Sequence, residues 1–257
     1  MSKIIGIIPC HLASVRFPRK ILYPFAGLAM VEHVRRRALM ADGLYEVIVA
    51  TCDDEIEAAV TAGGGRVVRT ANTHINGTSR IAEAVQGIKC DHVILLQGDE
   101  PLLLPAHVEA LIAGIKARPE GEVWNVTGPI EAEDELNRHS FVKCAVAPDD
   151  RIMYCFRRSP SNAPFEVQQT YIRKILGLFA FRRDALVEIA AEASSPVERA
   201  ESIEQMRLIE YGRKLVSVAV DASLPSVNEP HEADIVLEKI SKDPVQKALL
   251  ERVLAAN

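Results

Sequence analysis

Three short segments of the sequence carry side chains whose types could bind a charged ligand. The first, residues 9–20, follows the apolar run Ile4–Pro9 and places Arg16, Arg19 and Lys20 within five residues. Guanidinium forks and an ammonium beside backbone amides at a strand end suit a polyphosphate. On charge alone, a solvated basic loop is the commoner explanation. The loop lacks the glycines of GxGxxG or GxxxxGK, so Rossmann dinucleotide-binding and P-loop motifs are excluded.

The second segment is Gln97-Gly98-Asp99-Glu100-Pro101, directly after the apolar run HVILL. An acidic residue at the end of a buried strand is a common place to hold Mg²⁺ through oxygen ligands, with several waters retained on the metal. The alternative is a turn closed by glycine and proline, with solvated acids. The motif alone does not decide between the two.

The third segment, residues 73–80, combines small polar side chains with Gly77 and ends in Arg80. A glycine lets the backbone approach a ligand closely, and the guanidinium could reach a phosphate or a base edge. Thr78 or Ser79 could instead cap the following helix, which is the simpler explanation for either residue alone.

Alternating strands and helices are expected to position these segments. Near-continuous apolar runs predict parallel strands that are covered on both faces, and they alternate with helical patterns. Strand, helix, strand repeated in this way predicts a doubly wound, Rossmann-like, mostly parallel sheet, in which ligands bind outside the carboxyl ends of the strands. The predicted strands are 4–9, 46–51, 66–69, 92–97 and 123–129, and the predicted helices are 30–40, 54–62, 79–86 and 105–117.

The second half of the chain has a different character. Residues 142–147 and 151–157 predict an antiparallel hairpin, and a polar, irregular arm follows at 159–169. The remaining predictions are strands at 175–181 and 215–220 and helices at 184–193, 197–211 and 232–254. We therefore predict one α/β domain over residues 1–257, with an inserted hairpin and arm at about residues 140–172.

Composition limits the class of protein. The 257 residues carry a formal net charge of −5, so general nucleic-acid binding and attachment to an anionic membrane are not expected. Five scattered cysteines without a CxxC pair indicate reduced thiols rather than a disulfide framework. The first apolar run is too short for a signal peptide, and no stretch reaches the length of a membrane span. We expect a cytoplasmic protein.

Taken together in order, the segments resemble a known family. IIPCHLASVRFPRKIL, NGTSR, LLQGDEP, FVK, SIEQMRLIEYG and VNEP occur as they do in the CMP-Kdo synthetases (3-deoxy-manno-octulosonate cytidylyltransferases), and more distantly in acylneuraminate cytidylyltransferases. The resemblance covers nearly the whole chain. It implies that CTP and a 3-deoxy-2-ulosonic acid give a CMP-sugar and pyrophosphate, with Mg²⁺ as cofactor, in a homodimer built on the hairpin and arm.

The resemblance also implies roles for individual residues. Arg16 and Lys20 match triphosphate-binding catalytic positions, and Asp99 matches the catalytic Mg²⁺ ligand. The nucleotide-binding positions are Pro9, His11, Arg16, Lys20, Asn76, Gly77, Thr78, Ser79, Arg80, Gln97 and Gly98. The sugar-side positions are Gln97, Arg157, Ile175, Glu204 and Gln205, and Asn228 is a second metal position. For Glu204 and Gln205, exposed helix positions remain an alternative.

The sequence departs from the family pattern at several of these places. His11 stands where the family has arginine, and Arg19 where it has glycine. Asn228 replaces a metal-binding aspartate, which predicts weaker Mg²⁺ binding unless Glu229 compensates. Ile175 replaces a histidine, and Phe156 likewise replaces a serine, so the sugar pocket is predicted to be more apolar and its specificity changed.

Two other functions compete with the cytidylyltransferase. A glycosyltransferase of this fold would carry an Asp-x-Asp metal motif after an apolar strand, and only Asp53-Asp54 comes near it. A non-catalytic or differently specific nucleotide-sugar-binding homologue is suggested by His11 and Asn228. The sequence names neither the ulosonic acid nor the glycan pathway, whether lipopolysaccharide or capsule.

Overall fold

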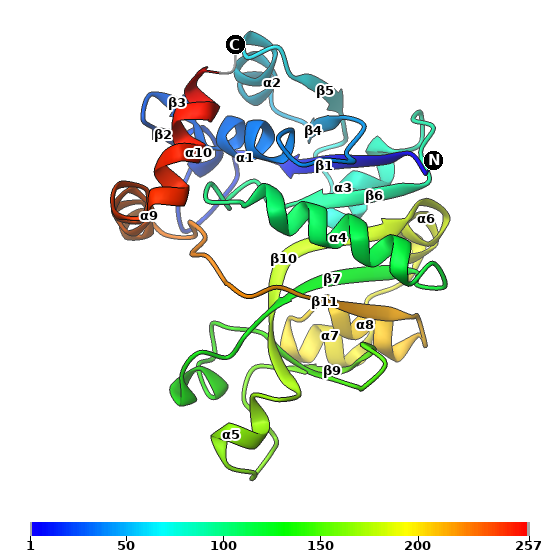
Figure 1. The fold of residues 1–257 in the computed structure, drawn as a ribbon. Coiled ribbons are helices and arrows are strands. Elements are labelled where there is room, and N and C mark those ends of the chain that lie inside the picture. The colour runs from blue at the N-terminus through cyan, green and yellow to red at the C-terminus, as the bar shows by residue number, and fades with distance from the viewer. Residues whose placement is uncertain (1, 256–257) are drawn as a thin grey trace. The chain divides into compact units, whose positions relative to one another are not determined.

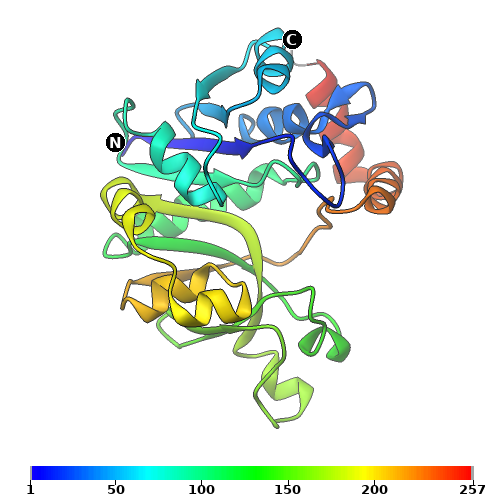
Figure 2. The same ribbon diagram turned by 180° about the vertical axis from the view of Figure 1, so that it is seen from behind.

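The computed structural model describes residues 2–255, which form two compact units. Unit 1 comprises residues 1–109 and 224–257, and unit 2 comprises residues 110–223. The boundary falls inside helix α4 (Pro105–Ala117). Figures 1 and 2 show the chain from opposite sides. The fold class is α/β with a mostly parallel central sheet, as predicted, and the prediction of a single domain stays a prediction.

Unit 1 is built on four parallel strands in the order β6-β1-β4-β5. Their bounds are β1 Ile4–Cys10, β4 Val47–Thr51, β5 Arg66–Arg69 and β6 His92–Leu96. Gly6 pairs with Val47 on one side and Ile94 on the other, so β1 lies in the middle of this set. Every residue of β4 is buried, as expected of a strand covered on both faces.

Helices join these strands and set the direction of the carboxyl ends. The connecting helices are α1 (Met30–Ala38), α2 (Asp54–Ala62) and α3 (Gly77–Ala84). Both α1 and α3 contact β1; α1 lies in front of β1 in Figure 1, and Figure 2 shows α3 on the other side. Parallel strands with right-handed crossovers place the loops after β1, β5 and β6 at one edge. This edge carries all three segments singled out in the sequence.

Short irregular elements follow the first loop and were not predicted. A 3₁₀ turn (η1) covers Lys20–Leu22, and the strands β2 (Pro24–Phe25) and β3 (Leu28–Ala29) form a small hairpin. Ala26 and Gly27 between them have φ values of 48° and 81°. Only the glycine adopts this region without cost.

The chain returns to unit 1 in two helices rather than the predicted single helix over 232–254. These are α9 (Pro230–Lys242) and α10 (Pro244–Ala255). Asp243 between them is extended, with φ −92° and ψ 114°, because a residue before proline is excluded from the helical region. Its carboxylate then accepts the Val245 amide at 2.9 Å and so starts α10.

Unit 2 is built on the strands β7 (Val123–Gly128), β10 (Ile172–Arg182) and β11 (Leu215–Ala219). Strand β7 pairs antiparallel with β10 and parallel with β11. The predicted hairpin is confirmed as β8 (Lys143–Val146) and β9 (Ile152–Phe156), and β8 pairs with β10. The polar arm contains one short helix, α5 (Phe165–Gln168), and residues 133–136 form a 3₁₀ turn (η2).

The helices of unit 2 follow β10 and differ from the prediction in one place. Helix α6 (Arg183–Ala191) was expected. The predicted helix over 197–211 is instead two helices, α7 (Pro196–Glu201) and α8 (Gln205–Glu210). Ser202 between them has a φ of 53°, in the left-handed region that ends a helix.

Candidate active site

The three segments predicted from the sequence line one pocket of unit 1. Two glycines make the close approach of these segments possible. A Cβ on Gly77 would lie 3.0 Å from Cγ of Pro9, and one on Gly98 would lie 3.0 Å from Sγ of Cys10, which is tighter than ordinary van der Waals contact. The lining residues are Pro9, Cys10, His11, Ser14, Lys20, Ile21, His74, Ile75, Asn76, Gly77, Arg80, Gln97, Gly98 and Asp99.

The first loop is tied to the loop that follows β4. The Leu12 amide donates to Asp53 Oδ2 at 2.9 Å, and the Arg19 amide closes the loop on the Leu12 carbonyl at 3.3 Å. Arg19 has a φ of 60°, a conformation for which glycine is favoured and which costs other residues about 1 kcal/mol. Its guanidinium forms a fork on the Glu55 carboxylate of α2, so Arg19 holds the loop rather than lining the pocket.

The two cationic residues assigned to the triphosphate contact the two residues assigned to the metal. Lys20 Nζ donates to Asp99 Oδ2 at 2.5 Å and to the Val227 carbonyl at 3.2 Å. Arg16 Nη2 donates to Asn228 Oδ1 at 3.2 Å. The Val227 amide in turn donates to the Asp99 carbonyl at 2.8 Å. The structure therefore brings Arg16 and Lys20 of one loop together with Asp99 and Asn228, which lie far from that loop in the sequence.

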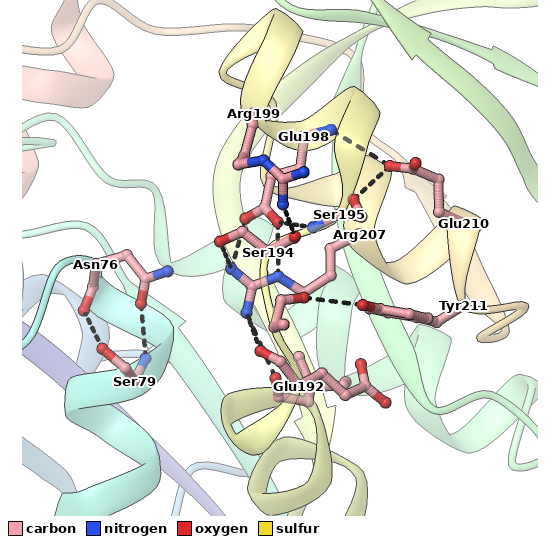
Figure 3. A network of polar contacts seen from close by, with 12 residues as sticks. Asn76, Ser79, Glu192, Ser194, Ser195, Glu198, Arg199, Arg207, Glu210 and Tyr211 are labelled. Atoms are coloured by element: carbon pink, nitrogen blue, oxygen red, sulfur yellow. Dashed lines mark hydrogen bonds and ion pairs between the residues drawn. The ribbon is translucent and has the colours of Figure 1, made fainter.

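The third loop begins helix α3 and is ordered by its own side chains. Asn76 is the N-cap: its Oδ1 accepts the Ser79 amide at 2.9 Å (Figure 3). The suggestion that Thr78 or Ser79 caps the helix is therefore wrong, because α3 starts at Gly77 and the cap lies one residue earlier. Thr78 is buried, and Ser79 Oγ contacts Asn76 O and His74 Nδ1 rather than lining the pocket.

Arg80 is held by a short polar network at the base of the same pocket. Its Nη1 donates to Thr70 Oγ1 at 2.7 Å and to the Ala71 carbonyl at 3.2 Å, and only 4% of the residue is exposed. His74 Nε2 meets the Glu83 carboxylate, and this contact lowers the pKa of Glu83. A buried, oriented guanidinium is suited to hold an anion or a polar base edge.

The surroundings of the pocket shift the pKa values of Cys10 and His11 in opposite directions. Burial raises the pKa of the Cys10 thiol, and the nearby Asp99 adds to this effect, so the thiol stays protonated and is a packing residue. Desolvation and then the neighbouring cation Arg80 lower the pKa of His11. His11 is therefore neutral at pH 7, whereas an arginine there would be charged.

Apart from Gln97, the residues assigned to the sugar belong to unit 2. Arg157 donates through three guanidinium nitrogens to the carbonyls of Glu201, His139 and Ser202, at 3.0, 2.9 and 3.1 Å. The guanidinium thus ties β9 to the turn between α7 and α8, which leaves at most two of its five donor hydrogens for a ligand.

Gln205 and Glu204, at the start of α8, are not exposed helix positions. Gln205 is 6% exposed, and its Nε2 donates to Oδ1 of the fully buried Asn125 at 3.1 Å. Glu204 is half-buried. Ile175 is half-buried at the start of an irregularity in the pairing of β10 with β7.

Phe156 departs from its predicted place. It is 6% exposed and packs with Ile130, Leu136 and Ile172 in a small apolar cluster, so the serine-to-phenylalanine change fills the core of unit 2.

Helix α8 is fixed in unit 2 by an ion-pair network (Figure 3). Arg207 donates to the Glu198 carboxylate through two nitrogens, and both residues are buried. The Glu210 carboxylate accepts Ser195 Oγ and the Val197 amide. Removing one partner of such a buried pair costs about 3–5 kcal/mol. The network holds the helix that carries Glu204 and Gln205.

Comparison with known proteins places the chain. A sequence model of the cytidylyltransferases matches residues 5–215. The 3-deoxy-manno-octulosonate cytidylyltransferase of Escherichia coli is 37% identical over the full length of both chains. That of Geobacter metallireducens is 36% identical over 93% of this chain and 98% of its own. The chain belongs to the cytidylyltransferase family.

A solved cytidylyltransferase has the same fold. It is a CMP:2-keto-3-deoxy-manno-octonic acid synthetase complexed with CTP, with a TM-score of 0.88 and 35% identity over 94% of this chain and all of that one. The predicted family and fold are therefore confirmed. The predicted roles of individual residues stay predictions.

Two residues that hold the loop after β6 were missed from sequence. Arg37 on α1 is fully buried, and its Nη1 reaches the Leu103 carbonyl at 3.4 Å and Gln246 Oε1 on α10 at 2.7 Å. Gln246 Nε2 donates to the Leu102 carbonyl at 3.1 Å. These two side chains brace the loop that carries Asp99. A buried arginine and glutamine on otherwise amphipathic helices give no sequence signal until the contact is seen.

The pocket's donor set fits a hard divalent cation that arrives with phosphates. Among residues 2–255, no group of three or more His, Cys, Asp or Glu side chains could hold a metal. Asp99 and the amide oxygen of Asn228 are hard oxygen donors, and Mg²⁺ typically takes one or two protein carboxylates plus phosphate oxygens and water. Glu229 starts α9, where its carboxylate lies 3.5 Å from His231 Nδ1.

Proposed function

We propose that this chain transfers CMP from CTP to a 3-deoxy-2-ulosonic acid, Kdo or a close relative, with release of pyrophosphate. The observation that carries the proposal is the pocket of unit 1, where Lys20, Arg80, Gln97 and Asp99 converge at the carboxyl ends of β1 and β6. Relatives of 37% and 36% identity carry the name of this activity, and none of the comparisons supports a binding-only homologue.

The reaction is an in-line displacement at the α-phosphorus of CTP. The anomeric hydroxyl oxygen of the sugar forms a bond to this phosphorus, the bond to the bridging oxygen of pyrophosphate breaks, and the hydroxyl proton is lost to solvent or a base. Such a reaction depends on positioning and on neutralising charge more than on a protein nucleophile. Cys10, the one thiol lining the pocket, is kept protonated and takes no part.

Residues of the first loop neutralise the charge that develops on the leaving group. Lys20 and Arg16 each carry donors directed at oxygen atoms in this structure, and the same donors can serve phosphate oxygens. Arg80 and the amides at the start of α3 hold the nucleotide, because a helix N-terminus and a buried guanidinium both favour an anion. Gln97 lines the pocket beside Asp99 and can contact either substrate.

Mg²⁺ belongs to the proposal as the cofactor held by Asp99 and Asn228. Bound there, it would supply a Lewis acid that offsets negative charge on the triphosphate. Its support is the oxygen donor set and the position of Asp99 at the end of β6. An Asn in place of a carboxylate lowers the negative charge of the site by one, so the protein is expected to need more Mg²⁺ than a site with two carboxylates.

A homodimer and a cytoplasmic location complete the proposal. Among the described strands, β9 pairs with β8 alone, and its Met153 and Tyr154 side chains are each 43% exposed. Exposed apolar side chains on such a strand are typical of an interface. No helix within residues 2–255 has the length and apolar character to cross a membrane. The mass in solution, measured by light scattering, tests the dimer.

Pyrophosphate release tests the proposed function. Purified protein would be incubated with CTP, Mg²⁺ and one of a panel of acids: Kdo, 8-amino-Kdo, sialic, legionaminic and pseudaminic acid. We expect turnover with at least one acid, CTP preferred over the other nucleoside triphosphates, and loss of turnover in Asp99→Asn. Tight CTP binding without turnover on any acid would favour a binding-only homologue.

A further inference from the structure

In the ligand-free protein, the two basic side chains proposed to bind the triphosphate contact the two side chains proposed to bind Mg²⁺. Lys20 Nζ lies 2.5 Å from Asp99 Oδ2, and Arg16 Nη2 lies 3.2 Å from Asn228 Oδ1. Each residue proposed to hold the triphosphate thus contacts one of the two residues proposed to hold Mg²⁺. A metal ion at Asp99 Oδ2 and Asn228 Oδ1 would compete with Lys20 and Arg16 for these oxygens, because the two positive side chains repel a divalent cation at the same place.

The Lys20 contact is a small built site rather than a surface ion pair. The side chains of Lys20 and Asp99 are 13% and 21% exposed. The ammonium also donates to the Val227 carbonyl at 3.2 Å, and the Val227 amide fixes the Asp99 backbone at 2.8 Å. The ammonium therefore lies between a carboxylate and a carbonyl oxygen. These are the ligand types that a hard divalent cation takes.

The Arg16 contact is exposed and engages the second oxygen. Asn228 Nδ2 donates to Ser226 Oγ at 3.0 Å, which turns Oδ1 toward Arg16. Arg19, the neighbouring cation of the loop, is instead paired with Glu55 on α2. The contact with the metal-binding oxygens is thus specific to Arg16 and Lys20 among the three basic residues of the loop.

We propose that Lys20 and Arg16 occupy the metal-binding oxygens of the free protein and exclude free divalent cations until the triphosphate arrives. The phosphate oxygens then take over both cationic side chains, and Asp99 and Asn228 become available to the metal that accompanies the nucleotide. This inference rests on the proposed function. It predicts that CTP and metal bind with strong positive coupling and that each raises the affinity for the other by the same factor.

A merely structural ion pair would behave differently. If the Lys20–Asp99 pair only holds the loop to β6, removing the ammonium destabilises the loop and leaves metal affinity unchanged. If the ammonium occupies the metal site, removing it leaves a partly buried carboxylate whose charge is uncompensated, and this carboxylate binds a divalent cation without nucleotide. Metal binding by the free protein separates the two cases.

The test measures Mn²⁺ binding without nucleotide, from the electron paramagnetic resonance signal of free Mn²⁺ titrated with protein. We expect wild type to bind weakly and Lys20→Met to bind at least tenfold more tightly. Arg19→Gln is the matched control: it removes the same charge one residue away and should change the affinity less than twofold. Equal Mn²⁺ affinity in wild type and Lys20→Met overturns the proposal, as does an equal gain in Arg19→Gln.

Further variants assign the gained site and guard against misfolding. Lys20→Arg keeps a cation and should stay weak, whereas Lys20→Met/Asp99→Asn should lose the gain of the single variant. Thermal unfolding shows which variants are folded. If Lys20→Met does not fold, wild type alone decides: Mn²⁺ binding without CTP as tight as binding with the saturated nucleotide complex overturns the proposal.

Turnover distinguishes failure of this inference from failure of the proposed function. If the wild-type protein releases pyrophosphate from CTP and an ulosonic acid but also binds free Mn²⁺ tightly, the proposed function stands. Lys20 and Arg16 then do not exclude free divalent cations. If Lys20→Met shows the tenfold gain in Mn²⁺ affinity but the wild-type protein turns over no acid in the panel, the inference about Lys20 and Asp99 stands and the proposed reaction is contradicted.

Discussion

The residues assigned to the nucleotide and those assigned to the sugar are used differently by the fold. In unit 1, Lys20, Arg80, Gln97 and Asp99 line one pocket. In unit 2, Arg157 donates three hydrogen bonds to backbone carbonyls, and Gln205 is buried against Asn125. The nucleotide-side groups therefore converge on one pocket, whereas on the sugar side Arg157 and Gln205 are used in contacts within unit 2.

The difference teaches where specificity can change. A side chain that only lines a pocket can be replaced at the cost of binding alone, and a side chain that also braces the fold cannot. Ile175, which makes no such polar contact through its aliphatic side chain, and Phe156, which fills a core, are the sugar-side positions that depart from the family pattern. We infer that the sugar pocket changes around Arg157 and Gln205 rather than through them.

The largest expected effect comes from removing the carboxylate of the nucleotide side. Asp99→Asn should lower turnover by about 10²–10³-fold, because it removes the carboxylate proposed to hold the Mg²⁺ that would offset charge on the triphosphate. Pyrophosphate release at saturating CTP measures it. Glu100→Gln is the control in the same loop. Equal losses in both variants would show that the loop is sensitive to any change of charge.

The next largest effect tests whether Arg157, on the sugar side, stabilises the fold. Arg157→Met removes the donors to three carbonyls and should lower the free energy of unfolding by about 2–4 kcal/mol, whereas CTP affinity stays the same. Thermal unfolding and CTP titration measure the two effects. Arg158→Met, at the exposed neighbouring residue, is the control. An unchanged unfolding temperature with a raised KM for the sugar would mean that Arg157 serves only the ligand.

A smaller effect on the nucleotide side is the pH dependence of CTP affinity, which reports the charge of His11. Because the pKa of His11 is lowered below its ordinary value of 6.5, His11 is neutral at pH 8 and gains charge only as the pH falls through that lowered pKa. His11→Arg should therefore tighten CTP binding by about threefold to tenfold at pH 8, and the gain should shrink as the pH falls through the lowered pKa of His11. CTP titrations over a series of falling pH values measure it. A gain independent of pH would contradict the prediction.

The smallest effect concerns the second proposed metal ligand. Asn228→Asp adds one negative charge beside the proposed metal and should lower the Mg²⁺ concentration for half-maximal activity by about twofold to fivefold. The measurement is an Mg²⁺ titration of pyrophosphate release at saturating CTP, with Asn137→Asp, the same change at an exposed position of unit 2, as the control. Unchanged Mg²⁺ dependence would remove Asn228 from the metal site.

Much of the fold could be predicted, because its signals are local. The bounds of α2 and α4 match the prediction, and β5 does too. The errors fall where one residue overrides the apolar period: Pro244 divides the last helix, and Ser202 in the left-handed region divides the helix at 197–211. A short run of residues cannot reveal that a chain will turn at a serine.

Of the candidate site, sequence could predict the loops but not their contacts. The pocket could be located from sequence because three loops at strand ends carry unusual residues. These are Gly77, Gly98 and the basic residues at 16–20. The carbonyls that engage Arg157 lie 18, 44 and 45 residues away in the chain. The brace from Gln246 to Leu102 spans 144 residues. Contacts at such separations follow from the packing of elements, which periodicity and spacing do not encode.

The division of unit 1 along the chain has a consequence for how the protein is made. Residues 1–109 need the segment from Leu224 onward to complete their unit, because Val227 fixes Asp99 and Gln246 holds the loop at Leu102. Synthesis runs from the N-terminus, so the first half of the nascent chain waits, incomplete, while the intervening 114 residues of unit 2 are added. Contacts of such long range form late and slowly. The nucleotide pocket, encoded first, is thus among the last parts of the protein to mature.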